Sequence, residues 1–240
     1  MEKECIILSG GLGTRLKSVV PDLPKSMAYI DGKPFLWYLV RYFLSQEVTT
    51  FVFALGYKQE VIEAYLSSSD SPFSNTDAQY KISVENEPLG TGGAIKKALM
   101  LTKCPNVLIA NGDTMFQVDT TALLDFHNQQ QSLCTLALKP MVDFERYGFV
   151  EIDGKNKVTD FKEKQFYEKG NINGGIYALD VDRFMQMDFP EKFSFEKEFL
   201  EPQAAQGSLF GLLQNGYFID IGIPEDYERA QTELPALFSK

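Results

Sequence analysis

A glycine-rich segment near the amino terminus has the residue types needed to hold a phosphate-bearing ligand. Residues 9–16 read SGGLGTRL and directly follow the apolar run 5–8. Glycines let the backbone approach a ligand closely and adopt positive φ, so that consecutive amides can point at a base or a phosphate. Arg15 adds a permanent cation. An ordinary strand-to-helix turn is the alternative, but three glycines followed by Thr14 and Arg15 favour a nucleotide site.

Two well-known phosphate-binding loops do not match this segment. The dinucleotide fingerprint requires glycine where this chain has Leu16. The P-loop requires Gly-Lys followed by Ser or Thr, whereas Lys17 and Ser18 follow Leu16 here. The segment therefore indicates a nucleotide site of another type.

Carboxylates at predicted strand ends indicate where a metal could bind. Asp113 follows the apolar run 106–110, and a carboxylate at a strand end can meet magnesium bound to phosphates. A Gly-Asp turn is the alternative, but the glycine-rich loop on a neighbouring strand favours the metal. Asp220 likewise ends the run 217–219. Glu225 and Asp226 follow Pro224 in the first turn of a predicted helix, where acidic residues are expected for structural reasons.

Short apolar runs alternate with segments long enough for helices, which predicts an α/β fold with a mostly parallel sheet. Strands are predicted at 5–8, 51–55, 80–84, 107–110, 133–138, 149–152, 158–162, 175–179 and 217–221. Helices are predicted at 34–46, 59–66, 92–101, 121–130, 182–187, 195–200 and from 224 onward. Residues 67–76, reading SSSDSPFSNT, are predicted to form a surface loop.

Composition limits the classes of partner. The formal charge of −10 opposes the basic surface that polynucleotide binding needs, but it does not exclude a free nucleotide held by local amides and cations. Three cysteines without paired spacing indicate a reducing compartment, and no apolar run is long enough for a membrane span, so we expect a cytoplasmic protein. The only histidine, His127, is interpreted as structural or exposed rather than catalytic.

The glycine-rich loop and later segments together resemble the sugar 1-phosphate nucleotidyltransferase family. The segments are Pro24-Lys25, EPLGTGG at 87–93, NGD at 111–113, RYG at 146–148, FKEK at 161–164, NGGIY at 173–177 and DIGIPED at 220–226. Each is weak alone, but the ordered set is specific. Ser26 stands where the family commonly has a second proline, and the loss of that rigid ring would loosen the aim of Lys25.

The resemblance implies a Rossmann-like, mostly parallel mixed sheet flanked by helices, with a GT-A-like nucleotidyltransferase arrangement. One domain would span residues 1–240, with 1–131 mainly binding nucleotide and 132–240 mainly binding sugar phosphate. The implied reaction is attack of a sugar-phosphate oxygen on the α-phosphorus of a nucleoside triphosphate. Because the nucleophile is already an anion, the protein must chiefly position two anions and neutralise charge, which requires cations and metal ligands rather than a triad.

The resemblance also assigns roles to individual residues. Arg15 and Lys25 would contact the triphosphate as catalytic cations, and Asp113 and Asp220 would bind Mg²⁺. The nucleotide would be bound by Ser9, Gly10, Gly11, Gly13, Thr14, Glu87, Gly92, Asn111 and Gly112. The sugar ring would meet Gly148, Glu163, Asn173 and Gly174, and Lys164 would hold the sugar phosphate.

Within the family, the short link 17–23 and the strings EPLGTGGA and IDIGIPEDY are most similar to bacterial heptose 1-phosphate guanylyltransferases. This implies GTP and D-glycero-D-manno-heptose 1-phosphate as substrates. Mannose-type guanylyltransferases and N-acetylmuramate-type uridylyltransferases share much of the pattern and remain alternatives. A glycosyltransferase would typically show an Asp-x-Asp motif, which residues 112–114 lack, and a non-catalytic sensor would show degraded cationic or metal positions. Aromatic residues in the last quarter favour core packing, with a homo-oligomer interface as the alternative.

Overall fold

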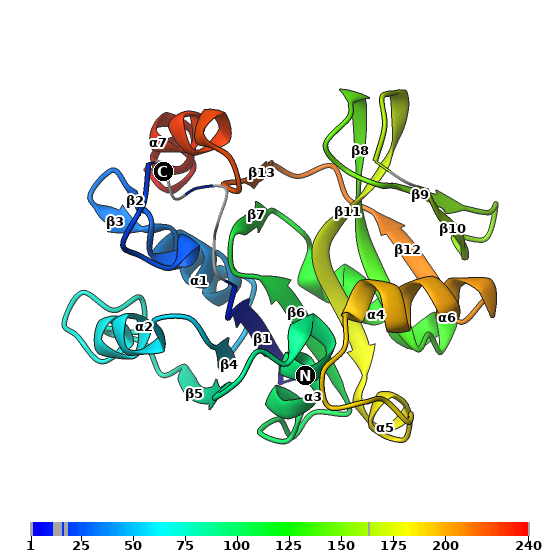
Figure 1. Cartoon of the computed structure of the whole chain (residues 1–240), viewed down its shortest axis with the longest axis horizontal. Helices are drawn as coiled ribbons and strands as arrows, with labels where there is room; N and C mark the ends of the chain where they lie inside the picture. The colour runs from blue at the N-terminus through cyan, green and yellow to red at the C-terminus, as the bar shows by residue number, and fades with distance from the viewer. Residues whose placement is uncertain (1, 12–15, 17–18, 163, 240) are drawn as a thin grey trace.

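The computed structural model describes residues 2–11, 16, 19–162 and 164–239. At its centre lies a mixed sheet in the order β10-β9-β11-β6-β1-β4-β5 (Figure 1). One side of the sheet is parallel, formed by β6 (Asn106–Asn111), β1 (Glu4–Ser9), β4 (Thr50–Leu55) and the edge strand β5 (Gln79–Val84). The antiparallel β11 (Tyr167–Asp180) continues the sheet beside β6. The prediction of a mostly parallel, Rossmann-like mixed sheet is therefore confirmed.

Helices cover both faces of the sheet, and the side chains of β1 show how the two cores are divided. Cys5 and Ile7 belong to one core and Ile6 to the other, because successive side chains of a strand point to opposite faces. The first core is covered by α1 (Phe35–Ser45), α2 (Gln59–Leu66), α4 (Thr120–Gln130) and α7 (Pro224–Phe238). The second is covered by α3 (Gly90–Leu99), α5 (Val181–Met185), the π-helix Phe195–Leu200 and α6 (Glu201–Ala205).

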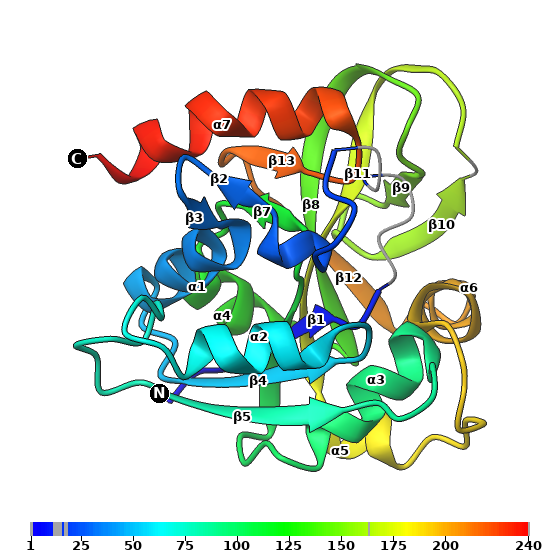
Figure 2. The ribbon, with the colours of Figure 1, turned by 60° about the vertical axis from the view of Figure 1, so that its left-hand side comes forward.

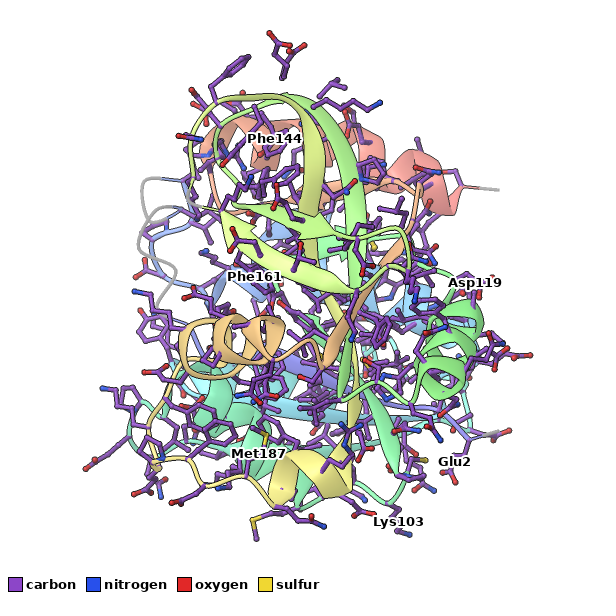
Figure 3. The ribbon with its side chains drawn as sticks, turned by 90° about the vertical axis from the view of Figure 1, so that its right-hand side faces the viewer. Glu2, Lys103, Asp119, Phe144, Phe161 and Met187 are labelled. Carbon is purple, nitrogen blue, oxygen red and sulfur yellow. The ribbon has the colours of Figure 1, made fainter. Side chains whose placement is uncertain are left out.

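The second half of the chain adds a long ribbon. Strand β8 (Cys134–Phe144) pairs antiparallel with β11, and β12 (Leu209–Leu213) lies parallel to β8. The hairpin of β9 (Phe149–Ile152) and β10 (Val158–Lys162) joins the sheet through β11. Figure 3 shows Phe144 on the projecting end of the ribbon and Phe161 on β10.

Two small sheets complete the fold. The strands β2 (Tyr29–Ile30) and β3 (Lys33–Pro34) form a hairpin before α1, and β7 (Thr114–Phe116) pairs with β13 (Phe218–Asp220). In Figure 2, β13 runs just beneath α7, which lies along the top of the molecule. The β7–β13 pair therefore ties the last part of the chain to the end of β6.

Most predicted elements are present, but several boundaries and strands differ. Strand β8 extends six residues past its predicted end, and β11 begins at Tyr167 instead of residue 175, because the two strands stabilise each other by pairing. Helix α3 begins at Gly90, two residues earlier than predicted. The predictions missed the short elements β2, β3, β7, β12 and α6.

The loop at residues 67–76 is built of turns as predicted, but it is not wholly at the surface. Phe73 is buried and packs edge-on against Phe51, with their ring centroids 5.2 Å apart. Among the described residues, no helix combines the length and apolar character needed to cross a membrane.

Candidate active site

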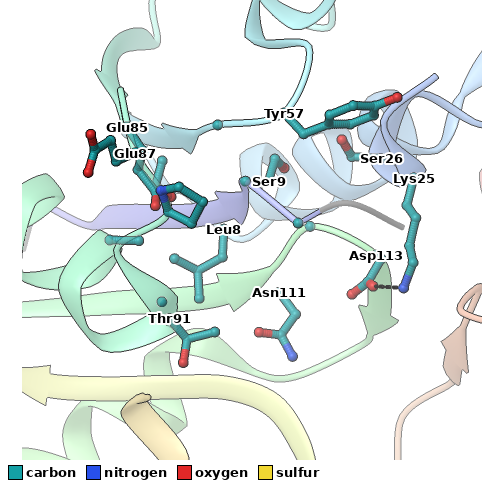
Figure 4. Close-up of a pocket in the computed structure, with 18 of the residues that line it drawn as sticks. Leu8, Ser9, Lys25, Ser26, Tyr57, Glu85, Glu87, Thr91, Asn111 and Asp113 are labelled. Carbon is teal, nitrogen blue, oxygen red and sulfur yellow. Dashed lines mark hydrogen bonds and ion pairs between the residues drawn. The ribbon is translucent and has the colours of Figure 1, made fainter. Parts of the chain in front are cut away.

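A pocket of about 630 Å³ opens at the carboxyl ends of the parallel strands β1, β4 and β6 (Figure 4). Ligands of open α/β sheets bind at this edge. The last residues of these strands and the residues that follow them form one side of the pocket, and residues 85–94 form another side. The lining residues are Leu8, Ser9, Gly10, Gly11, Lys25, Ser26, Ala54, Gly56, Tyr57, Glu85, Asn86, Glu87, Pro88, Gly90, Thr91, Ala94, Asn111, Gly112, Asp113 and Glu196.

The glycines of this pocket allow neighbouring loops to touch through their backbones. A Cβ atom on Gly56 would lie 3.0 Å from the Gly10 carbonyl oxygen, and the Tyr57 amide donates to that same oxygen at 3.3 Å. The Gly112 amide donates to the Leu8 carbonyl at 2.9 Å. The pocket lining thus includes five residues assigned to nucleotide binding from the sequence: Ser9, Gly10, Gly11, Asn111 and Gly112. Gly13, Thr14 and Arg15 lie outside the described residues.

Lys25 is held in the pocket by its own turn and by an acidic partner. The turn Lys25–Met27 is a 3₁₀ helix closed by the Met27 amide donating to the Pro24 carbonyl at 2.8 Å. From this turn, the Lys25 Nζ reaches Asp113 Oδ2 at 3.0 Å, as the dashed line in Figure 4 marks. The lysine is therefore aimed without the second proline that the family commonly has.

Strand pairing brings the two predicted metal ligands to the same place. Asp220 lies opposite Thr114 in the β7–β13 pair, and the Ile221 amide donates to the Asp113 carbonyl at 3.1 Å. The Asp220 carboxylate accepts from the Gly222 amide at 2.8 Å. Burial, and then the nearby negative charge of Asp113, raise the pKa of Asp220.

This pair of carboxylates fits a small hard cation. Two repelling anions in a partly buried position are stabilised by a divalent ion, and carboxylate oxygens are the ligands that magnesium prefers. Within the described part of the chain, no group of three or more histidine, cysteine, aspartate or glutamate side chains could hold a metal. Phosphate oxygens and water would have to supply the remaining ligands.

Acidic and hydroxyl side chains gather at the opposite end of the pocket. The Glu85 carboxylate accepts from the Leu89 amide at 2.7 Å, which folds the segment carrying Glu87 over the pocket. Thr91 Oγ1 donates to Glu196 Oε2 at 2.8 Å, so that the π-helix contributes a carboxylate to this wall. Sequence reasoning missed Glu85 and Glu196, because neither belongs to a recognisable spacing.

Gly92 has a packing position instead of the predicted position facing the nucleotide. Its amide donates to the Phe193 carbonyl at 3.0 Å, and a Cβ atom there would collide with the Phe193 ring. Gly90, Thr91 and Ala94 of the same helix line the pocket instead.

Four of the predicted acceptor residues are described, and they lie outside the lining of this pocket, on the ribbon side of the fold. Asn173 is at a bulge of β11, where its amide nitrogen donates to the Tyr177 hydroxyl at 2.8 Å. Gly174 packs tightly against the Phe116 ring. Gly148 precedes β9 and Lys164 is exposed just after β10. Glu163 lies outside the described residues.

An ionic network that sequence reasoning missed joins this acceptor side to α7. Arg146 Nη1 pairs with Asp226 Oδ2, and its Nη2 donates to the Tyr147 hydroxyl at 2.9 Å. Arg229 Nη1 contacts the other oxygen of Asp226 at 2.7 Å. Asp226 was predicted to be structural, and it is a buried anion shared by two arginines. The segments RYG at 146–148 and DIGIPED at 220–226 were recognised in the sequence, but the contact between them was not.

His127 is structural, as predicted. It is buried and makes hydrogen bonds to Thr135 Oγ1 at 3.0 Å and to Asn106 Oδ1 at 3.2 Å. Burial lowers the pKa of His127 to about 4, so the ring is neutral at pH 7.

The chain is similar in sequence and in structure to known proteins. The family model described as "Nucleotidyl transferase" matches residues 4–236. A D-glycero-alpha-D-manno-heptose 1-phosphate guanylyltransferase of Aneurinibacillus thermoaerophilus is 49% identical over 231 residues, covering 96% of this chain and 98% of the relative. The enzyme of the same name from Campylobacter jejuni is 45% identical, covering 93% and 96%. The crystal structure of HddC from Yersinia pseudotuberculosis complexed with GMP-PN superposes with a TM-score of 0.85 at 37% identity, covering 96% of this chain and 99% of that one.

Proposed function

This chain belongs to the nucleotidyl transferase family, and from that premise we propose that it transfers GMP from GTP to D-glycero-α-D-manno-heptose 1-phosphate. The products would be GDP-heptose and pyrophosphate. The two relatives described above, which are 49% and 45% identical to this chain, carry this activity in their names, and HddC, which superposes over nearly all of the chain, was crystallised with GMP-PN.

The reaction requires the protein to neutralise the negative charge of two phosphate-bearing substrates more than it requires a group that transfers a proton. An oxygen of the sugar phosphate forms a bond to the α-phosphorus of GTP, and the bond from that phosphorus to the β-phosphate oxygen breaks, so that pyrophosphate leaves with the electron pair. The attacking oxygen is already anionic. The absence of a histidine from the lining of the described pocket therefore fits the chemistry.

Lys25, together with Arg15, would bind the triphosphate and lower the repulsion between the two substrates. Asp113 supports this role of Lys25, because their ion pair holds the ammonium group at the pocket wall. Asp113 and Asp220 would hold Mg²⁺, which when bound would neutralise phosphate charge during the transfer.

The acidic end of the pocket supports guanine as the base. Guanine presents two adjacent N–H donors on its Watson–Crick edge, and a carboxylate can accept from both. Glu87 and Glu196 both line this end. Ser9, Gly10, Gly11, Asn111 and Gly112 would pack against the rest of the nucleotide, with Gly13 and Thr14 completing the loop.

The acceptor would bind on the ribbon side. Gly148, Glu163, Asn173 and Gly174 would meet the sugar ring, and Lys164 would hold its phosphate. Lys164 is exposed, so its ammonium group is free of burial and can turn toward an anionic ligand.

The three cysteines are free thiols, with Cys5 and Cys134 buried. Free thiols are typical of a reducing compartment, which supports a location in the cytoplasm.

The observation that carries this proposal is the ion pair of Lys25 with Asp113 in the lining of one nucleotide-sized pocket, with Asp220 brought beside Asp113 by the β7–β13 pair. The test is a screen of purified protein with GTP, ATP, UTP and CTP against heptose, mannose, glucose and N-acetylmuramate 1-phosphates, with released pyrophosphate as the signal. We expect GTP with the heptose to give the fastest turnover. Turnover with UTP but not GTP would refute the guanylyl assignment, and preference for mannose would refute the acceptor.

A pair of variants tests the metal site in the same assay. Asp113→Asn removes a negative ligand with little change in size, and we expect it to abolish Mg²⁺-dependent turnover. Asp125→Asn makes the same change on the exposed side of α4 and is the matched control. Full activity in Asp113→Asn would remove Asp113 from the metal site.

A further inference from the structure

Two serine hydroxyls stand out among the described residues. The only buried side-chain nitrogen or oxygen atoms in this part of the chain without a hydrogen-bond partner are Ser9 Oγ and Ser26 Oγ. Both residues line the nucleotide pocket. A buried polar group without a partner destabilises the fold, so native proteins rarely keep one unless a ligand or water completes it. Ser9 belongs to the predicted nucleotide loop, but Ser26 has no assigned role.

Ser26 is held firmly in place. It is 3% exposed and lies in the 3₁₀ turn directly after Lys25. The backbone of the turn is fixed by two hydrogen bonds, because the Met27 amide donates to the Pro24 carbonyl at 2.8 Å and the Ala28 amide donates to the Lys25 carbonyl at 2.9 Å. The backbone beneath the hydroxyl is therefore fixed, while the enclosed hydroxyl itself has no partner.

The position of Ser26 in the pocket indicates which part of the nucleotide it meets. In Figure 4, Ser26 and Lys25 are on one side of the pocket, and Glu85, Glu87 and Thr91 are on the other. The lysine side holds an ammonium group paired with Asp113, whereas the charged groups on the other side are the glutamates. An anionic phosphate is favoured beside the lysine and disfavoured beside the glutamates.

We propose that Ser26 Oγ donates a hydrogen bond to a phosphate oxygen of the bound nucleoside triphosphate, beside Lys25. This inference rests on the proposed function and adds to it a binding residue where the family commonly has proline, which has no hydroxyl. A hydroxyl donating to an anionic oxygen makes a strong, charge-assisted hydrogen bond. Binding of the nucleotide thus supplies the partner that the free protein lacks.

The proposal predicts that one substitution has opposite effects on folding and on binding. In Ser26→Ala, loss of the unpartnered hydroxyl should leave the stability of the free protein unchanged or higher, as measured by urea unfolding. The same variant should bind GTP with Mg²⁺ about tenfold more weakly in calorimetry, because one charge-assisted bond is lost. Affinity for guanosine, which has no phosphate, should change less than twofold.

Ser132→Ala is the matched control. Ser132 is equally buried, but its Oγ donates to the Cys134 carbonyl at 2.7 Å and lies outside the pocket lining. We expect this variant to lose stability and to keep the wild-type affinity for GTP. It thereby separates the effect of a lost buried hydroxyl from the effect of a lost ligand contact.

The possible results decide between the alternatives. Wild-type affinity of Ser26→Ala for GTP overturns the proposal, whatever its stability. Equal weakening of GTP and guanosine overturns the phosphate contact and places Ser26 against the base or ribose. A wild-type protein that binds no GTP contradicts the proposed function itself, and this outcome is distinct because it appears before any variant is made.

Discussion

Replacing Gly112 by alanine tests whether close backbone packing between the ends of β1 and β6 is needed for the reaction. A Cβ atom at Gly112 would collide with the Ser9 hydroxyl and would lie 2.6 Å from the Leu8 carbonyl oxygen. The hydroxyl is the end of a side chain and can rotate. The carbonyl belongs to a central strand, so the segment carrying Gly112 must move instead.

The size of that movement follows from the contact distance. Ordinary contact with a Cβ begins at 3.4 Å, so the distance to the Leu8 oxygen must grow from 2.6 Å by about 0.8 Å. Asp113 is the next residue and must move with the backbone. Overpacking of this kind costs about 1 to 3 kcal/mol of unfolding free energy. A displacement near 1 Å at a group that positions reactants can slow turnover on the order of 100-fold.

The assay compares Gly112→Ala with Gly154→Ala by pyrophosphate release and by urea unfolding. Gly154 lies in the β9–β10 turn, with no atom within 4 Å of its would-be Cβ, and its substitution should change neither quantity. The double variant Ser9→Ala/Gly112→Ala removes the hydroxyl clash but keeps the clash with the Leu8 carbonyl. If the double variant recovers wild-type turnover, the reasoning from the backbone is refuted.

Three further predictions concern groups around this centre. Because burial holds the pKa of His127 at about 4, below its ordinary 6.5, the neutral ring contributes stability that is complete above pH 6.5 and lost as the pH falls toward 4. Urea unfolding should therefore show that, between pH 7 and pH 4.5, the unfolding free energy of His127→Gln falls by about 2 to 3 kcal/mol less than that of wild type. Equal falls in the two proteins would contradict the assignment of His127 as a buried neutral ring. Glu87→Gln should reduce selectivity for GTP over UTP at least tenfold in kcat/KM, through loss of a charged acceptor for guanine; unchanged selectivity would move base recognition to Glu196. Asp226→Asn should lower the unfolding free energy by about 2 kcal/mol, because Arg146 and Arg229 share that anion, and should raise the KM for the sugar phosphate more than the KM for GTP; equal changes in both would argue against a link between Arg146 and the acceptor side.

Strands buried on both faces were the elements that the sequence predicted best. The β4 residues are all buried, and from Phe51 to Leu55 they form an unbroken apolar run that can be recognised without knowledge of its partner strands. In contrast, the first half of β11 is largely polar, and β7 is only three residues long. Their extended conformation comes from pairing with β8 and β13, which lie elsewhere in the chain. Local periodicity contains no information about such partners.

The candidate site likewise contains residues that local sequence predicted and residues that only tertiary packing brings there. Ser9, Lys25 and Asp113 were predicted because short motifs carry them, and the structure gathers them in one pocket. Glu196 reaches that pocket only because the π-helix packs on α3, where Thr91 holds its carboxylate. Gly92 was placed in the site by its motif, but tertiary packing assigns its amide to Phe193.

The β7–β13 pair explains why the glycine-rich loop alone does not define the reaction. The first half of the chain supplies most of the pocket lining, including Lys25 and Asp113, but Asp220 arrives only with β13. That strand is secured by its pairing with β7 and by the Phe218 ring set edge-on against Phe116 at 5.6 Å. Phe116 also packs under Gly174, a predicted acceptor residue. The Phe116 side chain therefore connects β13, which carries the proposed metal ligand Asp220, to the proposed sugar site. The metal site thus gains its second proposed ligand from the same packing that places the acceptor half.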